Sequence, residues 1–313
     1  MKSKERTYKF GFFTDSHFSV IRQAFRTDSF FDSVLSKVKQ SYEHFKKEGC
    51  EFALFGGDFF DKYASNSRPM LRAVRDMIMS SGITTYFIWG QHDLFGYERS
   101  SSSGSNLEFL ESICDGKLVG INDVINIDGI EVYASHVYQD PEAILSSIPE
   151  DIEQPVVVLV HSLLAHEESS FGQIDIHSLS KTRANLVLSG DLHCGYDQIE
   201  SKGTLFYNPG SIARTSRERR RPKCCVVKIS RLLSSWQTEI EDFYLDCEEF
   251  PFPEIEEKIE VSKEQDSKEY IEAFEKFKSE SNDIFERLHK VGKEHNVSED
   301  ILRYIESKKK IDS

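Results

Sequence analysis

The feature that most constrains the fold of this chain is a repeated pattern in which a short apolar run ends abruptly in aspartate, histidine or glycine. The first run starts at Lys9, reads Lys-Phe-Gly-Phe-Phe-Thr, and ends in Asp15-Ser-His17. Taken alone, it predicts a buried strand whose polar end could be an ordinary strand exit. An aspartate and a histidine two positions apart are also suitable ligands for a divalent metal ion. The recurrence of the pattern favours the second interpretation.

Four further predicted strands end in the same way, at residues 51–55, 83–89, 155–160 and 185–189. Amphipathic helices are predicted over 28–47 and 68–80, between the first three strands. Strand, polar cluster and helix in this order predict an α/β fold with parallel strands and right-handed crossovers. Because the carboxyl ends of parallel strands line one edge of a sheet, the residues that follow them are expected to meet. They are Asp15, His17, Asp58, Gln91, His92, Asp93, His161, Asp191 and His193.

These residue types suit a pair of metal ions and an acid. Seven of them can supply ligands for two divalent ions, and two ions about 3.5–4 Å apart clamp a phosphoryl group and activate a water. His92 followed by Asp93 has the form of an acid whose ring is oriented by a carboxylate. The pattern therefore predicts a phosphoesterase.

The remainder of the chain predicts a mixed architecture. A short helix is expected over 106–113, and short strands over 117–137 with an Asp128-Gly129 turn predict hairpins. Two more strands are expected over 224–229 and 238–245, before Pro251 and Pro253 mark a boundary. We predict one domain over 1–250 and a short C-terminal helical extension over 251–313.

Composition limits the location and the partners. The chain has 313 residues, a formal net charge of -14, and six cysteines without a C-x-x-C spacing. No window reaches the roughly 20 apolar residues of a membrane span, and the start does not read as a signal peptide. A reducing, cytoplasmic location and no membrane partner are expected. The charge argues against coating nucleic acid, but a nuclease remains compatible, because bound cations would supply positive charge.

The strand-end motifs together resemble the calcineurin-like metallophosphoesterase superfamily, over about residues 8–247. The resemblance implies a four-layer sandwich of two mixed β-sheets flanked by helices. It also implies that Asp58 bridges two metals. By position, the first metal would be held by Asp15, His17 and His193, and the second by Gln91, His161 and Asp191.

Two positions depart from the family pattern, and both fall on the second metal. Gln91 stands where the family usually has Asn, and Asp191 stands where it usually has His. Such a site should be harder and more negative, which favours Mn²⁺, or else Mg²⁺, over Zn²⁺. The alternative is a degenerate second site.

Within the superfamily, softer cues resemble the SbcD-type DNA-repair exonucleases. They are Gly57-Asp58-Phe-Phe-Asp61, the run from Gly82 into Gln91, and the Tyr207-Asn-Pro-Gly-Ser211 turn. Protein Ser/Thr phosphatases usually have Asp-Arg-Gly where this chain has Asp61-Lys62-Tyr63. The resemblance implies a two-metal-dependent phosphodiesterase that cleaves DNA as an exonuclease subunit in repair or recombination. SbcD-type chains also carry a DNA-capping domain, for which the roughly 60 residues after Pro253 are too few.

The C-terminal segment predicts a protein partner rather than DNA contact. Residues 248–313 hold 19 acidic and 12 basic residues, and apolar stripes recur at helical spacing. The stripes fit either packing on the parent domain or partner binding. The SbcD resemblance implies that such helices hold the coiled coil of an SbcC-type ATPase, and the chain has no P-loop of its own. A homodimer is left open.

A basic run follows the Tyr207–Ser211 turn. It could grip a DNA backbone or be a solvated loop. Two other functions stay open: a small-molecule or nucleotide metallophosphoesterase, and a non-catalytic scaffold with a degenerate second metal site. The basic residues are Arg214, Arg217, Arg219, Arg220, Arg221 and Lys223.

Overall fold

The computed structural model describes residues 6–21, 26–64, 67–97, 101–166, 173–215, 220–232 and 235–247. The chain divides into two units, Met1–Pro253 and Glu254–Ser313. Every element described below belongs to the first unit. The predicted C-terminal helical extension lies outside the described residues.

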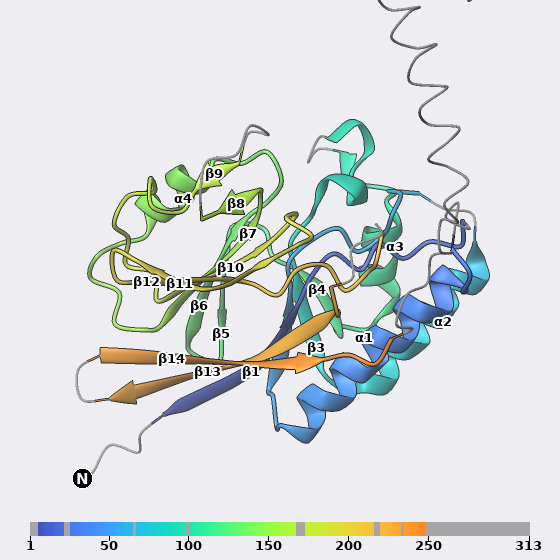
Figure 1. Cartoon of the computed structure of the whole chain (residues 1–313), viewed down its shortest axis with the longest axis horizontal. Coiled ribbons are helices and arrows are strands. Elements are labelled where there is room, and N and C mark those ends of the chain that lie inside the picture. The colour runs from blue at the N-terminus through green and yellow to red at the C-terminus, as the bar shows by residue number, and fades with distance from the viewer. Residues whose placement is uncertain are drawn as a thin grey trace, which may run out of the picture. The chain divides into compact units, whose positions relative to one another are not determined.

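Two six-stranded mixed sheets form the centre of the first unit (Figure 1). In the first sheet four parallel strands are extended at one edge by an antiparallel pair. Its strands, in spatial order, are β14 (Ser235–Tyr244), β13 (Lys223–Leu232), β1 (Thr7–Phe13), β2 (Phe52–Phe55), β3 (Thr84–Phe87) and β4 (Leu118–Gly120).

The second sheet has a parallel centre with an antiparallel strand at each edge. A separate pair of short strands, β8 (Leu164–Ala165) and β9 (Ile174–Asp175), follows β7. The six strands of the second sheet, in spatial order, are β11 (Tyr196–Ser201), β12 (Thr204–Asn208), β10 (Leu186–Gly190), β7 (Val156–His161), β6 (Ile130–Ser135) and β5 (Val124–Ile127).

Helices cover the outer faces of both sheets, so the predicted sandwich of two mixed sheets between helical layers is confirmed (Figure 1). The first three helices pack on the first sheet and the fourth on the second. Two short 3₁₀ turns, η1 (Gln91–Asp93) and η2 (Phe95–Tyr97), follow β3. The helices are α1 (Phe30–Lys47), α2 (Arg68–Ser81), α3 (Asn106–Ile113) and α4 (Pro141–Ser147).

Local sequence explains where the helices begin and end. The Ser29 hydroxyl accepts a hydrogen bond from the Asp32 N–H, so α1 begins at Phe30, two residues later than the apolar spacing predicts. Ser67 caps α2 in the same way, and Gly82 ends it in the left-handed region, with a φ of 74°.

Side-chain alternation along the strands builds one core between the sheets and one under each helical layer. On β1, Phe10 and Phe12 face the second sheet, where they join Leu159 and Leu188. Phe13 points the other way and packs under α1. Because every central strand is buried on both faces, the apolar runs are nearly continuous, as parallel sheets require.

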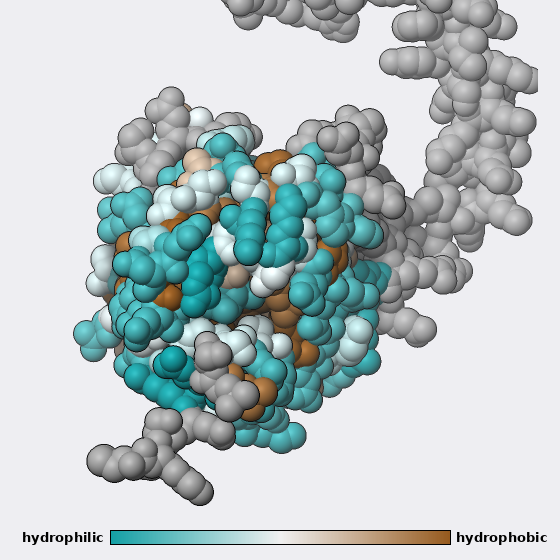
Figure 2. All heavy atoms as spheres, turned by 90° about the vertical axis from the view of Figure 1, so that its left-hand side faces the viewer, coloured by the Kyte–Doolittle hydropathy of each residue, from teal (hydrophilic) through white to brown (hydrophobic). Residues whose placement is uncertain are grey.

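The surface is consistent with this interior. The side drawn in Figure 2 is mostly hydrophilic, with hydrophobic residues showing only in limited areas. Among the described residues, no helix is both long enough and apolar enough to span a bilayer.

The region 117–137 differs from the hairpins predicted for it. Only β5 and β6 form a hairpin, around Asp128 and Gly129. β4 instead pairs in parallel with β3 and becomes the edge of the first sheet. A three-residue strand cannot show in its sequence which neighbour it will pair with, so this assignment depends on the packing of α3 before it.

Candidate metal centre

The loops that follow β1, β2, β3, β7 and β10 meet at one place, where the carboxyl ends of both sheets come together. Within the first sheet, the Asp15 N–H donates to the Gly57 carbonyl and the His17 N–H to the Asp58 carbonyl, each over 3.1 Å. Between the sheets, the Asp191 N–H donates to the Asp15 carboxylate over 3.2 Å. These backbone hydrogen bonds fix the loops to one another.

Four of the predicted site residues have strained backbones. The φ angles are 54° at Asp15, 45° at His17, 56° at Asp58 and 75° at Asp191. A non-glycine residue in this left-handed region costs about 1–3 kcal/mol, and such strain persists only where the surrounding structure enforces it. Half of the eight described non-glycine residues with positive φ lie in this one site, which marks it as functional.

Glycines allow the closest approaches. A Cβ on Gly90 would lie 2.1 Å from the Asp58 Oδ1, and a Cβ on Gly57 would lie 2.4 Å from the His161 Nδ1. Gly57 also has a φ of 100°, which other residues rarely adopt. The side chains of Asp58 and His161 therefore occupy the space that these two glycines leave.

One half of the site gathers the three residues predicted for the first metal. The Nε2 atoms of His17 and His193 face each other over 3.0 Å. The Asp15 Oδ1 lies 3.9 Å from the former and 3.6 Å from the latter. These three residues offer ligand atoms that all lie within 4.8 Å of one another.

The Asp58 carboxylate lies between the two halves. Its Oδ2 is 3.7 Å from the His17 Nε2 and 3.5 Å from the His161 Nε2. This oxygen is buried and has no hydrogen-bond donor, whereas the Oδ1 accepts the His92 backbone N–H over 2.9 Å. A buried carboxylate oxygen without a donor is costly unless a cation binds it, so the residues present fit a bridged pair of metal ions.

The second half brings together the three residues predicted for the second metal, Gln91, His161 and Asp191. The His161 Nδ1 lies 2.7 Å from the Gly56 carbonyl, which can only accept, so the Nδ1 carries a proton and the Nε2 is the atom that could bind a metal ion after losing its own proton. The Gln91 side chain links this ring to Asp191: its Oε1 is 2.9 Å from the His161 Nε2, and its Nε2 donates to the Asp191 Oδ1 over 2.8 Å. Asp191 is thus linked to His161 through the Gln91 amide.

The electrostatics suit cations. Burial raises the pKa of Asp15 to about 6 and lowers that of His17 to about 3, so the latter ring is neutral. Burial would lower the pKa of His161, yet Asp58, Asp15 and Asp191 raise it to about 10. Burial would raise the pKa of Asp58, but the neighbouring imidazoles, His161 above all, hold it below its ordinary value. A metal ion would replace the proton on His161, since a ligating imidazole must be neutral.

The predicted pairing of His92 with Asp93 is corrected by the structure. The His92 Nδ1 lies 2.8 Å from the Asp61 backbone carbonyl, which is the group that orients the ring. The buried Asp93 carboxylate instead accepts the backbone N–H groups of Phe59, Phe60 and Gly90, over 3.0–3.2 Å. The 3₁₀ turn directs the Asp93 carboxylate toward these N–H groups. Adjacency of His92 and Asp93 in the sequence does not reveal this geometry.

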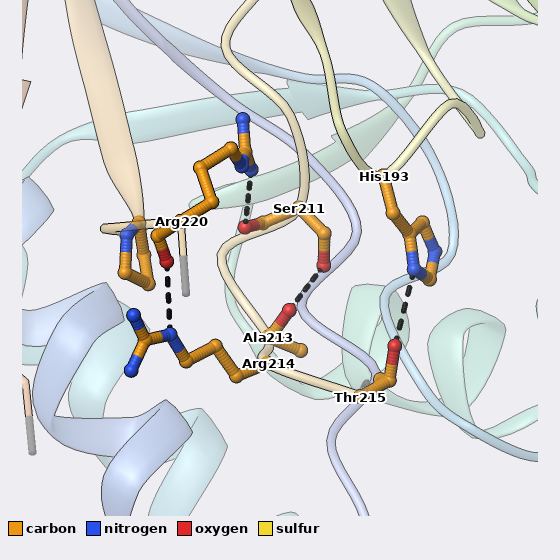
Figure 3. A pocket seen from close by; sticks show the side chains of 7 residues that line it. His193, Ser211, Ala213, Arg214, Thr215 and Arg220 are labelled. Carbon is orange, nitrogen blue, oxygen red and sulfur yellow. Dashed lines mark hydrogen bonds between the residues drawn. The ribbon is translucent and has the colours of Figure 1, made fainter. Parts of the chain in front are cut away.

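The described arginines of the basic run make hydrogen bonds within the protein, and their predicted contact with DNA stays a prediction. The Arg214 Nε donates to the Arg220 carbonyl, and Arg220 donates to the Ser211 carbonyl, both in a pocket beside His193 (Figure 3). Arg221 donates to the Leu245 carbonyl and pairs with Asp246. These arginines brace the chain after the Tyr207–Ser211 turn through internal hydrogen bonds. Arg217 and Arg219 lie outside the described residues.

Two residues near the centre were not singled out from the sequence. The Thr215 hydroxyl lies 3.2 Å from the His193 Nδ1 (Figure 3), and Asp61 groups with His17 and His92 within 4.8 Å. Asp61 entered the sequence analysis only as part of two family cues and not as a site residue. Nothing in the local pattern marks Thr215, because its contact joins segments 22 residues apart.

Comparison with known proteins agrees with this site. The model of the calcineurin-like phosphoesterase family matches residues 8–195, more than half of the chain. The chain belongs to this family. The match includes every strand end described above, so the metal-dependent phosphoesterase chemistry of the family is assigned to this centre.

Two solved structures are similar to this chain at low identity. A dimetal phosphatase from Danio rerio is 10% identical with a TM-score of 0.51, over 77% of this chain and 99% of that one. Purple acid phosphatase PPD1 from yellow lupin is 14% identical with a TM-score of 0.47, over 76% of this chain and 52% of that one. Only the first similarity is close enough to support the fold. No curated protein matches the sequence significantly.

Metal binding and acid catalysis should separate by mutation. Asp58→Asn removes the charge between the two halves, so we expect the Mn²⁺ affinity to fall by at least about 100-fold. Substitution of a residue that only supports a ligand typically lowers metal affinity by about 10- to 100-fold. His92→Ala should bind metal normally and lose about 10²–10⁴-fold in the rate of phosphodiester hydrolysis. Calorimetric titration with Mn²⁺ measures the first effect. Loss of metal in His92→Ala with retention in Asp58→Asn would reverse the two roles.

The corrected role of Asp93 predicts an effect on stability. Asp93→Ala leaves three buried N–H groups without an acceptor, which should lower the free energy of unfolding by on the order of 3 kcal/mol. His92→Ala and the exposed control Asp151→Ala should each change it by less than about 1 kcal/mol. Urea denaturation followed by circular dichroism measures all three. If Asp93→Ala is as stable as the control, these hydrogen bonds contribute nothing to the fold.

Proposed function

We propose that this protein is a two-metal-dependent phosphodiesterase that cleaves DNA, as an exonuclease subunit of the SbcD type. The observation that carries the phosphoesterase part is the buried Asp58 Oδ2 between the Nε2 atoms of His17 and His161. The DNA part is supported by the SbcD-like cues, among them Asp61-Lys62-Tyr63 in place of the phosphatase Asp-Arg-Gly.

The residues divide into metal holders and an acid. Asp15, His17 and His193 would hold one ion, His161 and Gln91 the other, with Asp191 in support, and Asp58 would contact both. The ions would supply positive charge to the phosphoryl oxygens and activate a water. Without cations this centre would repel phosphate, because the net charge of the chain is -14 and the centre holds three aspartates.

His92 is suited to serve the leaving group. Since the Asp61 carbonyl fixes the proton on its Nδ1, the Nε2 is the atom that can exchange a proton with a ligand. The His92 ring lies against that of His17, with centroids 4.8 Å apart. As the bond from phosphorus to the leaving oxygen breaks, a proton on the His92 Nε2 would pass to that oxygen.

We propose Mn²⁺ as the preferred ion, with Mg²⁺ as the next candidate. The second half of the centre offers the Gln91 amide oxygen and the Asp58 carboxylate, with His161 as its imidazole and the Asp191 carboxylate behind Gln91. Oxygen ligands favour these ions over Zn²⁺. The Asp191 carboxylate can only accept hydrogen bonds, so the Gln91 NH₂ must point to it and the amide oxygen is turned toward His161.

One observation favours a second candidate function, a small-molecule or nucleotide phosphoesterase. The described arginines of the basic run are hydrogen-bonded within the protein, which leaves them fewer N–H donors for DNA phosphates. A non-catalytic scaffold is less well supported, because the oriented ring of His92 has no use in an inert site.

DNA cleavage and its metal dependence test this function. Purified protein with labelled single- and double-stranded DNA should cleave best with Mn²⁺, less with Mg²⁺, and not at all with EDTA. The physical reason is that oxygen-rich ligands hold these ions and the ions carry the activated water. Turnover of a nucleotide monoester or a cyclic nucleotide much faster than any DNA would favour the second candidate.

The C-terminal segment is proposed to bind an SbcC-type ATPase, which would supply the ATP-driven step. Deleting residues 254–313 should leave Mn²⁺-dependent hydrolysis of bis(p-nitrophenyl) phosphate within about twofold of the full chain, because the metal centre belongs to the first unit. Co-purification with the ATPase should be lost. Unfolding of the truncated protein would show instead that the segment completes the fold.

A further inference from the structure

A large cleft lies between α2 and α3, apart from the metal centre. Its volume is about 1190 Å³, above the roughly 300–1,000 Å³ of most small-molecule sites. Both helices cover the same outer face of the first sheet (Figure 1). The size of the cleft suits a segment of a macromolecule.

The cleft carries positive charge in a strongly acidic chain. Arg68, Arg72 and Arg75 line one wall, at the spacing that places them along one side of α2, against the single acid Glu108 on the other wall. They extend over about 10 Å of the helix axis. Asp76 pairs with both Arg72 and Arg75, over 3.8 and 3.0 Å, but the Arg72 side chain is still 84% exposed.

The cleft also has an apolar part. Leu71 and Ile113 line it while packing on the core below. Phe109 projects from α3 with 48% of its surface exposed. Exposed aromatic rings next to arginines are the pattern of single-strand nucleic-acid surfaces, where bases stack on rings and cations hold the phosphates.

The cleft lies close to the metal centre. Asp61, whose carbonyl orients His92, is three residues before Ala64, which lines the cleft, so at most about 11 Å of chain separates them. Between them, Tyr63 accepts the Asn106 N–H at the start of α3, and its ring lies 5.1 Å from that of Phe95, which is 62% exposed. A second exposed aromatic ring, that of Phe95, therefore lies against the segment that joins the centre to the cleft.

We infer that the cleft between α2 and α3 binds a single strand of nucleic acid whose phosphodiester lies at the metal centre. This inference rests on the proposed function. An acidic helix of a partner protein would match the charge of the cleft, but it would give no reason for its closeness to His92 or for the exposed rings of Phe95 and Phe109. The arginines would hold the phosphates, and Phe109 and Phe95 would stack on bases.

Binding of a fluorescein-labelled oligothymidylate of about 15 nucleotides, with phosphorothioate linkages that slow cleavage, to the Mn²⁺-loaded full chain tests the inference. Arg68→Gln/Arg72→Gln should raise the Kd at least about tenfold and reduce the slope of log K against log salt by about 1.4, the loss of two phosphate contacts. Phe109→Ala should raise the Kd by roughly 5- to 150-fold, the range for one lost stacking contact, and leave that slope unchanged.

A matched control removes the same charge elsewhere. Lys46→Gln/Lys47→Gln lies on exposed positions of α1 and should change the Kd by less than about threefold, because it removes only a long-range attraction. All variants should hydrolyse bis(p-nitrophenyl) phosphate with Mn²⁺ at the native rate. Equal effects of the two double variants would overturn the inference.

Two further outcomes separate the inference from the function on which it rests. If the native chain cleaves DNA but the cleft variants bind it with native affinity, the cleft is not the strand site and the function stands. If the cleft variants lose binding only to an acidic helical peptide, the cleft is a protein-docking surface and the inference is wrong. If the native chain hydrolyses the small diester but neither binds nor cleaves DNA, the proposed function itself fails.

Discussion

The carboxylate of Asp58 is the group on which the rest of the centre depends. One of its oxygens accepts the His92 N–H, and the other lies without a donor between two imidazoles. The residue adopts a positive φ and requires the absence of a Cβ at Gly90. An unsatisfied buried carboxylate oxygen opposes folding. The cations that this family binds explain why the Asp58 oxygen has no donor. The centre is therefore arranged for metal binding at the expense of stability.

The centre depends equally on the packing of two sheets. The first sheet supplies Asp15, His17, Asp58, Gln91 and His92, and the second supplies His161, Asp191 and His193. Between them lies a core in which Phe10 and Phe12 meet Leu159 and Leu188. Because neither sheet holds a complete set of ligands, the apolar contact between the sheets determines whether the two halves meet. The strain at the four positive-φ residues is offset by this burial.

The two departures from the family pattern belong together. Gln91 is one methylene longer than Asn, and Asp191 is shorter than His. In the structure the longer amide reaches across to the shorter carboxylate, which holds its NH₂ and turns its oxygen to His161. A carboxylate at position 191 thus acts on the centre through Gln91. This pairing gives a physical reason for both changes and is compatible with an intact second half.

The sequence by itself predicted the five strands that end in site residues, the first three helices and the residues at those strand ends, because periodicity and apolar runs report burial locally. The sandwich of two mixed sheets followed from the order of those elements and the family resemblance, and it is confirmed. Tertiary structure alone decided the partners of individual polar groups. Asp93 holds three backbone N–H groups, the Asp61 carbonyl orients His92, and the arginines after Ser211 bond within the fold. A hydrogen bond depends on positions within a few tenths of an ångström. Contacts between segments distant in sequence fix those positions, and local sequence patterns do not record them.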